Sequence, residues 1–168
     1  MEEVIASTDV VRTSDSLILR LCSGYRQLAD QLRRDGVECE LDQYYDSPAA
    51  GWPGWMSGQI FDSDRFILTV ASPDYLRRWC LAERSGVGLG AKYESRQIRQ
   101  VLYAQECLNG RVIPVVFEAE AESYIPRELQ DTTWYDVSTS EGYDRLLRRL
   151  TGHQAIMAPS VGEHGRKG

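Results

Sequence analysis

Two nearly unbroken apolar runs, residues 65–71 and 112–117, place the strongest constraint on what this chain can fold into. Short runs rich in β-branched residues are typical of strands covered on both faces, because no position in them is reserved for solvent. Pro114 lies inside the second run, and proline is rare in central strands because it has no N–H to donate. We therefore expect this strand to lie near an edge of the sheet or to carry a local irregularity.

Helical patterns alternate with these runs. Between residues 17 and 34, apolar side chains recur at steps of three and four with arginines between them, and Gly36 follows as a stop signal. Shorter strands are predicted at 37–41 and 132–137, and further helices at 55–62, 72–82, 91–109 and 143–150. Strands that alternate with helices predict an α/β fold with a mainly parallel sheet and helices on both faces.

The composition suits one soluble domain and disfavours several classes of function. The 168 residues carry 19 basic and 25 acidic side chains, a net charge of −6, whereas general nucleic-acid binders neutralise phosphates with an excess of cations. No apolar run approaches the length of about 18 residues that crosses a bilayer, and residues 1–7 lack the basic and apolar regions of a secretory signal. We therefore expect a cytoplasmic protein without membrane insertion.

The spacing of cysteines and histidines disfavours metal binding and nucleophilic catalysis. Cys22, Cys39, Cys80 and Cys107 lie far apart without a C-x-x-C pair, so neither a zinc site nor any other metal is expected. A Ser-His-Asp or Cys-His catalytic group needs a histidine that the fold holds in place. Both histidines lie at or beyond the last predicted helix, so we do not expect such a group.

Glu94 is a candidate site residue. Its spacing to Ile98 and Val101 places a carboxylate on the helix stripe that should face the sheet. Two explanations remain open from this spacing. An acidic residue in the first turn of a helix complements the helix dipole. Alternatively, the carboxylate borders the crevice at the carboxyl ends of the strands, where open α/β sheets place their ligands.

Aromatic residues cluster around residues 42–54, a segment rich in turn formers that is predicted to be a long loop. Tyr44, Tyr45, Trp52 and Trp55 have two interpretations. They cover the core, as most such aromatics do, or they form a recognition surface, because aromatic residues near arginine are typical of interface anchors.

A series of motifs gives the chain a resemblance to a known family. The motifs stand at 28–37, 41–44, 51–56, 59–60, 72–76, 93–94, 98, 102–103, 112–117, 125–126 and 142–152. Among them are Gly51-Trp52-Pro53-Gly54-Trp55-Met56 and Ser72-Pro73-Asp74-Tyr75-Leu76. In this order, they resemble the SEFIR domain, a relative of the Toll/interleukin receptor (TIR) domain, over about residues 14–153.

This resemblance implies a flavodoxin-like, doubly wound sheet, in agreement with the periodicity. SEFIR domains act by homotypic association in signalling, and the bacterial stand-alone members look like signalling or defence modules. The implied partners are SEFIR or TIR domain proteins, including a second copy of this chain. The segment that begins at Asp42 would correspond to the recognition loop of TIR-like domains, and would present Tyr44, Tyr45, Trp52 and Trp55 to a partner.

An enzymatic alternative follows from the same resemblance. Many TIR domains hydrolyse NAD with one glutamate in the helix after the third strand. Glu94 is the position most like it, and Glu83, in a W-C-x-x-E run, is the second choice. NAD would then be a substrate, and no cofactor is implied. Cleavage of the nicotinamide ribosyl bond passes through an oxocarbenium-like state, which an anionic carboxylate stabilises.

The N-terminal segment departs from the family pattern. The family opens with a hydrophobic strand and a Ser-Tyr-Ser-like loop, of which residues 1–13 keep only a faint version. Either residues 4–7 or residues 10–13 would supply this first strand, which we expect to be weak. Residues 14–153 are predicted to form the SEFIR domain, and residues 154–168 to be a disordered tail because they offer little to bury.

Overall fold

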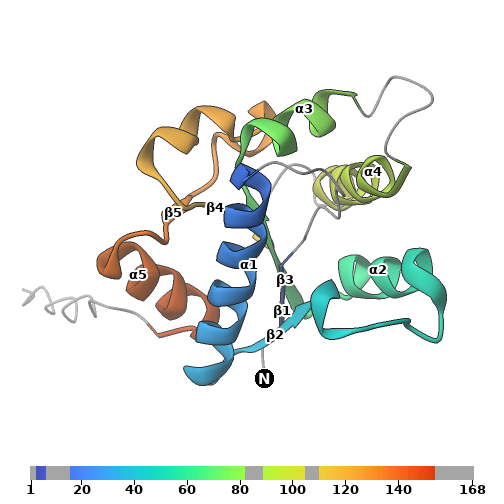
Figure 1. Cartoon of the computed structure of the whole chain (residues 1–168), viewed down its shortest axis with the longest axis horizontal. Helices are drawn as coiled ribbons and strands as arrows, with labels where there is room; N and C mark the ends of the chain where they lie inside the picture. Colours follow the sequence, from blue (N-terminus) through green and yellow to red (C-terminus); the bar gives the residue numbers. More distant parts are fainter. Residues whose placement is uncertain (1–2, 7–15, 82–88, 105–109, 154–168) are drawn as a thin grey trace, which may run out of the picture.

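The computed structural model describes residues 3–6, 16–81, 89–104 and 110–153, which contain a five-stranded sheet (Figure 1). Its strands are β1 (Glu3–Ala6), β2 (Glu38–Leu41), β3 (Arg65–Val70), β4 (Val112–Val116) and β5 (Tyr135–Asp136). They lie in the order β2-β1-β3-β4-β5, and each pair of neighbours is parallel. This is the strand order of flavodoxin-like sheets, so the predicted doubly wound fold is confirmed.

The first strand, β1, lies in the interior of the sheet although it is only 4 residues long. It pairs with β2 on one side and β3 on the other, so that Val4 lies opposite both Cys39 and Phe66. Of the two segments considered for this strand, residues 4–7 overlap β1. The other segment, residues 10–13, and the predicted disordered tail, residues 154–168, lie outside the described residues.

Helices cover both faces of the sheet (Figure 1). They are α1 (Ser16–Arg34), α2 (Gly51–Phe61), α3 (Pro73–Leu81), α4 (Leu89–Ala104) and α5 (Ser140–Thr151), with short 3-10 helices at Asp42–Tyr44 (η1), Ala119–Tyr124 (η2) and Arg127–Leu129 (η3). Buried residues of α1 and α5 join one core cluster, and those of α2, α3 and α4 join another.

Strand β3 contributes side chains to both core clusters. Leu68 and Val70 belong to the cluster with α1 and α5, whereas Ile67 belongs to the cluster with α2, α3 and α4. Successive side chains of a strand point to opposite faces, so β3 is buried from both sides, as its apolar run predicts. Full burial of each such side chain contributes about 1.5–3 kcal/mol.

Pro114 is tolerated in β4 because of the way β4 pairs. The Val115 carbonyl accepts a hydrogen bond from the Ala71 N–H, and the Val116 carbonyl accepts one from the Val137 N–H, both at 2.9 Å. Alternate residues of β4 therefore face β3 and β5, and Pro114 faces the β5 side. Because β5 pairs only with Val115 and Val116, the missing N–H removes no ladder hydrogen bond, and β4 lies next to an edge strand.

Helix α2 begins at Gly51, so the predicted start at residue 55 and the predicted loop 42–54 are wrong. The helix η1 takes the start of that segment and the first turn of α2 takes its end. Pro53 fits this turn, because the first N–H groups of a helix have no acceptor within the helix. Gly51 has a φ of 68°, which glycine adopts without strain, and its N–H donates to the Pro48 carbonyl at 2.9 Å.

Gly142, in the first turn of α5, packs against the end of β5. A Cβ at this position would lie 1.8 Å from the Asp136 carbonyl oxygen. The Gly142 N–H also donates to the hydroxyl of the N-cap residue Thr139 at 3.0 Å. The close approach of α5 to β5 therefore requires glycine here.

We expect Gly142→Ala to lower the free energy of unfolding by about 3 kcal/mol, because the added methyl group must push backbone apart. Gly58→Ala is the matched control, since Gly58 is also helical and a Cβ there meets nothing within 4 Å. That substitution should stabilise the protein by up to about 1 kcal/mol. Urea unfolding followed by circular dichroism measures both, and similar effects of the two variants would contradict this account.

Candidate functional site

Helix α2 carries no charge and lies mostly in solvent. From Ser47 to Phe61 the chain contains no charged residue. A helix that is apolar on all sides is normally buried. Of the 11 residues of α2, all of which the structure describes, Ile60 alone is buried, whereas Trp52 is 41% and Phe61 50% exposed. Contiguous exposed apolar surface is typical of sites that contact other molecules.

Tyr45, Trp52 and Trp55 form one contiguous group at the start of α2, here called the aromatic surface. The ring centroid of Trp55 lies 5.4 Å from that of Tyr45 and 6.0 Å from that of Trp52, the latter pair edge to face. The Tyr45 hydroxyl donates to the carboxylate of Glu40 on β2, a bond that raises the pKa of this hydroxyl. The three rings are therefore held in a defined arrangement although Tyr45 and Trp52 are exposed.

Two other residues of the predicted recognition loop lie apart from the aromatic surface. The Tyr44 hydroxyl donates to Asp30 Oδ1 at 2.7 Å, the Arg33 guanidinium lies 5.4 Å from its ring centroid, and the ring packs against the core cluster of α1 and α5. Asp42 is half-buried at the start of η1, where its carbonyl accepts from the Tyr45 N–H at 3.0 Å. The structure thus brings together three of the five predicted residues.

Sequence reasoning missed the contact between α2 and α4. Gln97 on α4 is buried and donates from Nε2 to Ser57 Oγ on α2 at 2.7 Å. Phe61, at the C-terminal end of α2, was also missed, and its side chain is 50% exposed. The uncharged run 47–61 is the sequence signal that could have indicated this whole helix, because surface helices normally carry charges on their outer face.

Of the two glutamates considered as alternatives for NAD hydrolysis, Glu83 lies outside the described residues. Glu94 is in α4, and its side chain is likewise outside the described part of the molecule. Because α4 begins at Leu89, Glu94 lies in its second turn, and its expected place in the first turn is wrong. The helix-dipole explanation is weakened accordingly, since this effect falls off within the first turn.

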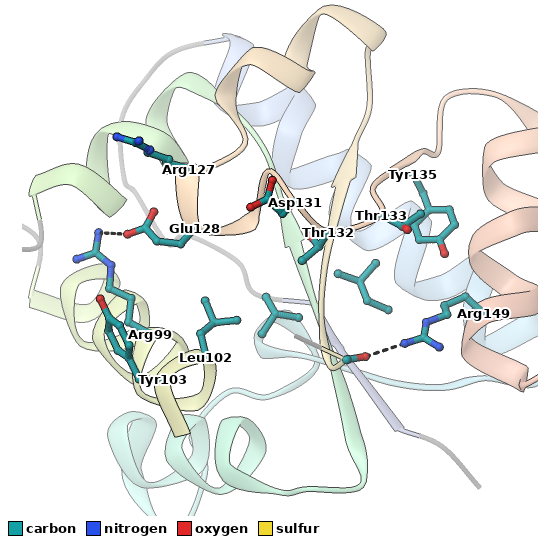
Figure 2. A pocket seen from close by; sticks show the side chains of 13 residues that line it. Arg99, Leu102, Tyr103, Arg127, Glu128, Asp131, Thr132, Thr133, Tyr135 and Arg149 are labelled. Atoms are coloured by element: carbon teal, nitrogen blue, oxygen red, sulfur yellow. Dashed lines mark hydrogen bonds and ion pairs between the residues drawn. The ribbon is translucent and has the colours of Figure 1, made fainter. Parts of the chain in front are cut away.

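A cavity of about 860 Å³ opens at the amino ends of β4 and β5 (Figure 2). Apolar side chains of α4 and β4 line it, and three arginines border it: Arg99 of α4, Arg127 of η3 and Arg149 of α5. Arg99 is paired with Glu128 at 3.4 Å, and the Arg149 guanidinium donates to the Gly110 carbonyl at 2.9 Å. Open α/β sheets bind ligands at the carboxyl ends of their strands. This cavity lies at the opposite ends and contains none of the predicted site residues.

Within the described ranges, no group of three or more His, Cys, Asp or Glu side chains could hold a metal ion. The helices described there also include none that is long and apolar enough to cross a membrane. The aromatic surface on α2 is therefore the candidate site, and its chemistry is suited to binding another protein.

Comparison with known proteins defines the class. A family model described as TIR domain matches residues 25–151, so the chain belongs to the TIR domain family. A crystal structure of a prokaryotic SEFIR domain is similar in fold, with a TM-score of 0.64 and 21% sequence identity, over 95% of this chain and 99% of that one. These findings confirm the resemblance inferred from the motifs. None of the curated proteins matches the chain.

Tyr44 in η1 and Tyr143 in α5 have pKa values above the usual value of 10.0. Burial raises the pKa of Tyr44 first, and its bond to Asp30 raises it further. Burial also raises the pKa of Tyr143, whose hydroxyl donates to Asp35 Oδ2 at 2.6 Å. A tyrosine whose pKa is higher in the folded than in the unfolded state stabilises the fold at pH values below the unfolded-state pKa. At higher pH this stabilisation is lost, because the unfolded chain releases the proton first.

We expect the free energy of unfolding to fall between about pH 8 and about pH 11, and to fall less in Tyr44→Phe, which has one of these hydroxyls removed. At pH 8 this substitution should cost about 0.5–1.5 kcal/mol for the lost hydrogen bond. Urea unfolding at both pH values tests this. Tyr103→Phe is the control, because Tyr103 is 70% exposed. An unchanged pH dependence in Tyr44→Phe would count against the assignment.

Proposed function

We propose that this TIR-family domain is a cytosolic signalling or defence adaptor that associates with SEFIR or TIR domains, a second copy of itself included, through the aromatic surface. The observation that carries the proposal is the exposure of Trp52 and its neighbours on a helix that has no charge. Burial of such surface on association is favourable, at about 25 cal/mol per Å² of apolar area removed from water.

The composition of the surface supports this role. Tryptophan and tyrosine are enriched among the residues that dominate binding energies, because they bury a large area with few rotatable bonds. The bond between Tyr45 and Glu40 and the edge-to-face contact of the tryptophans order these side chains in advance. Less conformational entropy is then lost when a partner binds.

We expect Trp52→Ala to weaken self-association by on the order of 30-fold or more, the loss of about 2 kcal/mol that marks a binding hot spot. Sedimentation velocity over a concentration series measures the association constant. Tyr103→Ala is the matched control, since this aromatic residue is 70% exposed but lies on α4, away from the aromatic surface. Equal association of wild type and Trp52→Ala would remove α2 from the interface.

The same samples distinguish association from the enzymatic alternative that the resemblance implies. Nicotinamide release from NAD is measured at the highest protein concentration, with Glu94→Ala and Glu83→Ala beside the wild type. Release that is lost in one of these variants would make the protein an NAD hydrolase and identify its carboxylate. An assembled wild type without nicotinamide release supports the adaptor function alone.

A further inference from the structure

Helix α2 is attached to the domain unevenly. Ile60, near its C-terminal end, is buried in the core, and Met56 packs against the same cluster. Trp52, in the N-terminal half, is exposed. One buried aliphatic side chain limits the distance of a helix from the core but little else, because apolar contacts are not directional. Polar contacts, such as the hydrogen bond from Gln97 on α4 to Ser57, therefore contribute to the orientation of α2.

Arg111 supplies such contacts to the C-terminal end of α2. From its guanidinium, Nη2 donates to the Ile60 carbonyl at 3.1 Å and also to the Asp62 carbonyl, and Nε donates to the Arg65 carbonyl at 2.8 Å. The last carbonyls of a helix have no partner within it, so these bonds satisfy groups that would otherwise be left to solvent. One side chain thereby joins α2, the turn after it and the start of β3.

The backbone of Arg111 is itself fixed in the sheet. Its carbonyl accepts from the N–H of Ile67 on β3 at 2.8 Å, and the neighbouring Gly110 carbonyl accepts from Arg149 on α5. The backbone of Arg111 is therefore held by the sheet while its side chain holds α2, and the planar guanidinium fixes the directions of its hydrogen bonds. Lysine cannot reproduce this arrangement, because its single ammonium group has no rigid fork of donors.

A second arginine reinforces the same end of the helix. Arg65 pairs with the Asp62 carboxylate at 3.0 Å and donates to the side chain of Gln59 in the last turn of α2. Arg65 and Asp62 follow α2 directly in the chain, so their contacts shape the turn locally. Arg111 is about 50 residues away in sequence, and its hydrogen bonds connect the end of α2 to the start of β4.

We infer that Arg111 is a positioning residue that fixes the C-terminal end of α2 from the start of β4, and so sets the orientation in which the aromatic surface meets a partner. This inference rests on the proposed function for its second half. Its first half, the control of α2 by Arg111, concerns the isolated domain. The two halves are tested by different measurements on the same variants.

The experiment compares Arg111→Ala, Arg111→Lys and Arg99→Ala by hydrogen exchange on dilute, unassociated protein. Arg99 is the matched control: it donates to the Trp79 carbonyl at 2.9 Å and pairs with Glu128, so it joins other elements by the same chemistry. We expect amide exchange in residues 56–66 to become at least tenfold faster in Arg111→Ala, and to change less in Arg111→Lys. In Arg99→Ala these residues should exchange as in the wild type.

Self-association of the same variants is then measured by sedimentation at a temperature where all of them are folded. A tenfold or greater loss of affinity in Arg111→Ala, partly recovered in Arg111→Lys and absent in Arg99→Ala, supports the inference. Unchanged exchange in α2, equal acceleration throughout the domain, or fast exchange with wild-type affinity would each overturn it. If the wild type itself does not associate, the proposed function fails, while the exchange data still decide the role of Arg111 in the monomer.

Discussion

Burial of β3 on both faces is the constraint on which the rest of the structure depends. A parallel sheet connects each strand to the next by a crossover, and the helices of these crossovers supply the apolar cover that β3 needs. The helices α1 and α5 cover one face, and α2, α3 and α4 cover the other. Crossover helices need only one apolar face for this task, which leaves their outer faces free for other chemistry.

Helix α2 departs from this pattern. It joins the edge strand β2 to the interior strand β3, and only its C-terminal half reaches the core. Its outer side is uncharged and aromatic where an ordinary crossover helix carries charges. Tyr45 and Trp52 leave 39% and 41% of their surface exposed, which fits the association proposed for this member of the TIR domain family.

Much of the architecture could be predicted from the sequence. The runs 65–71 and 112–117 became β3 and β4, and the pattern of residues 17–34 became α1, because burial periodicity is a local property of the chain. The start of α2 was not predicted, because glycine and proline at positions 51 and 53 are typical of loops. The first turn of a helix also accepts proline, since its N–H groups have no acceptor within the helix. Tyr44 and Tyr45 are adjacent, yet one turns toward α1 and the other toward Trp55. Composition cannot distinguish such neighbours.

The sequence by itself determined the class of fold and the presence of an aromatic, uncharged segment, because both depend on side-chain type and spacing along the chain. Only the tertiary structure decided which aromatic rings meet and which residues hold them. Arg111 is the clearest case, since it contacts the carbonyls of Ile60, Asp62 and Arg65. Every residue has a backbone carbonyl, so the residue types at these three positions do not reveal that Arg111 binds there. Only the folded backbone brings these carbonyls together.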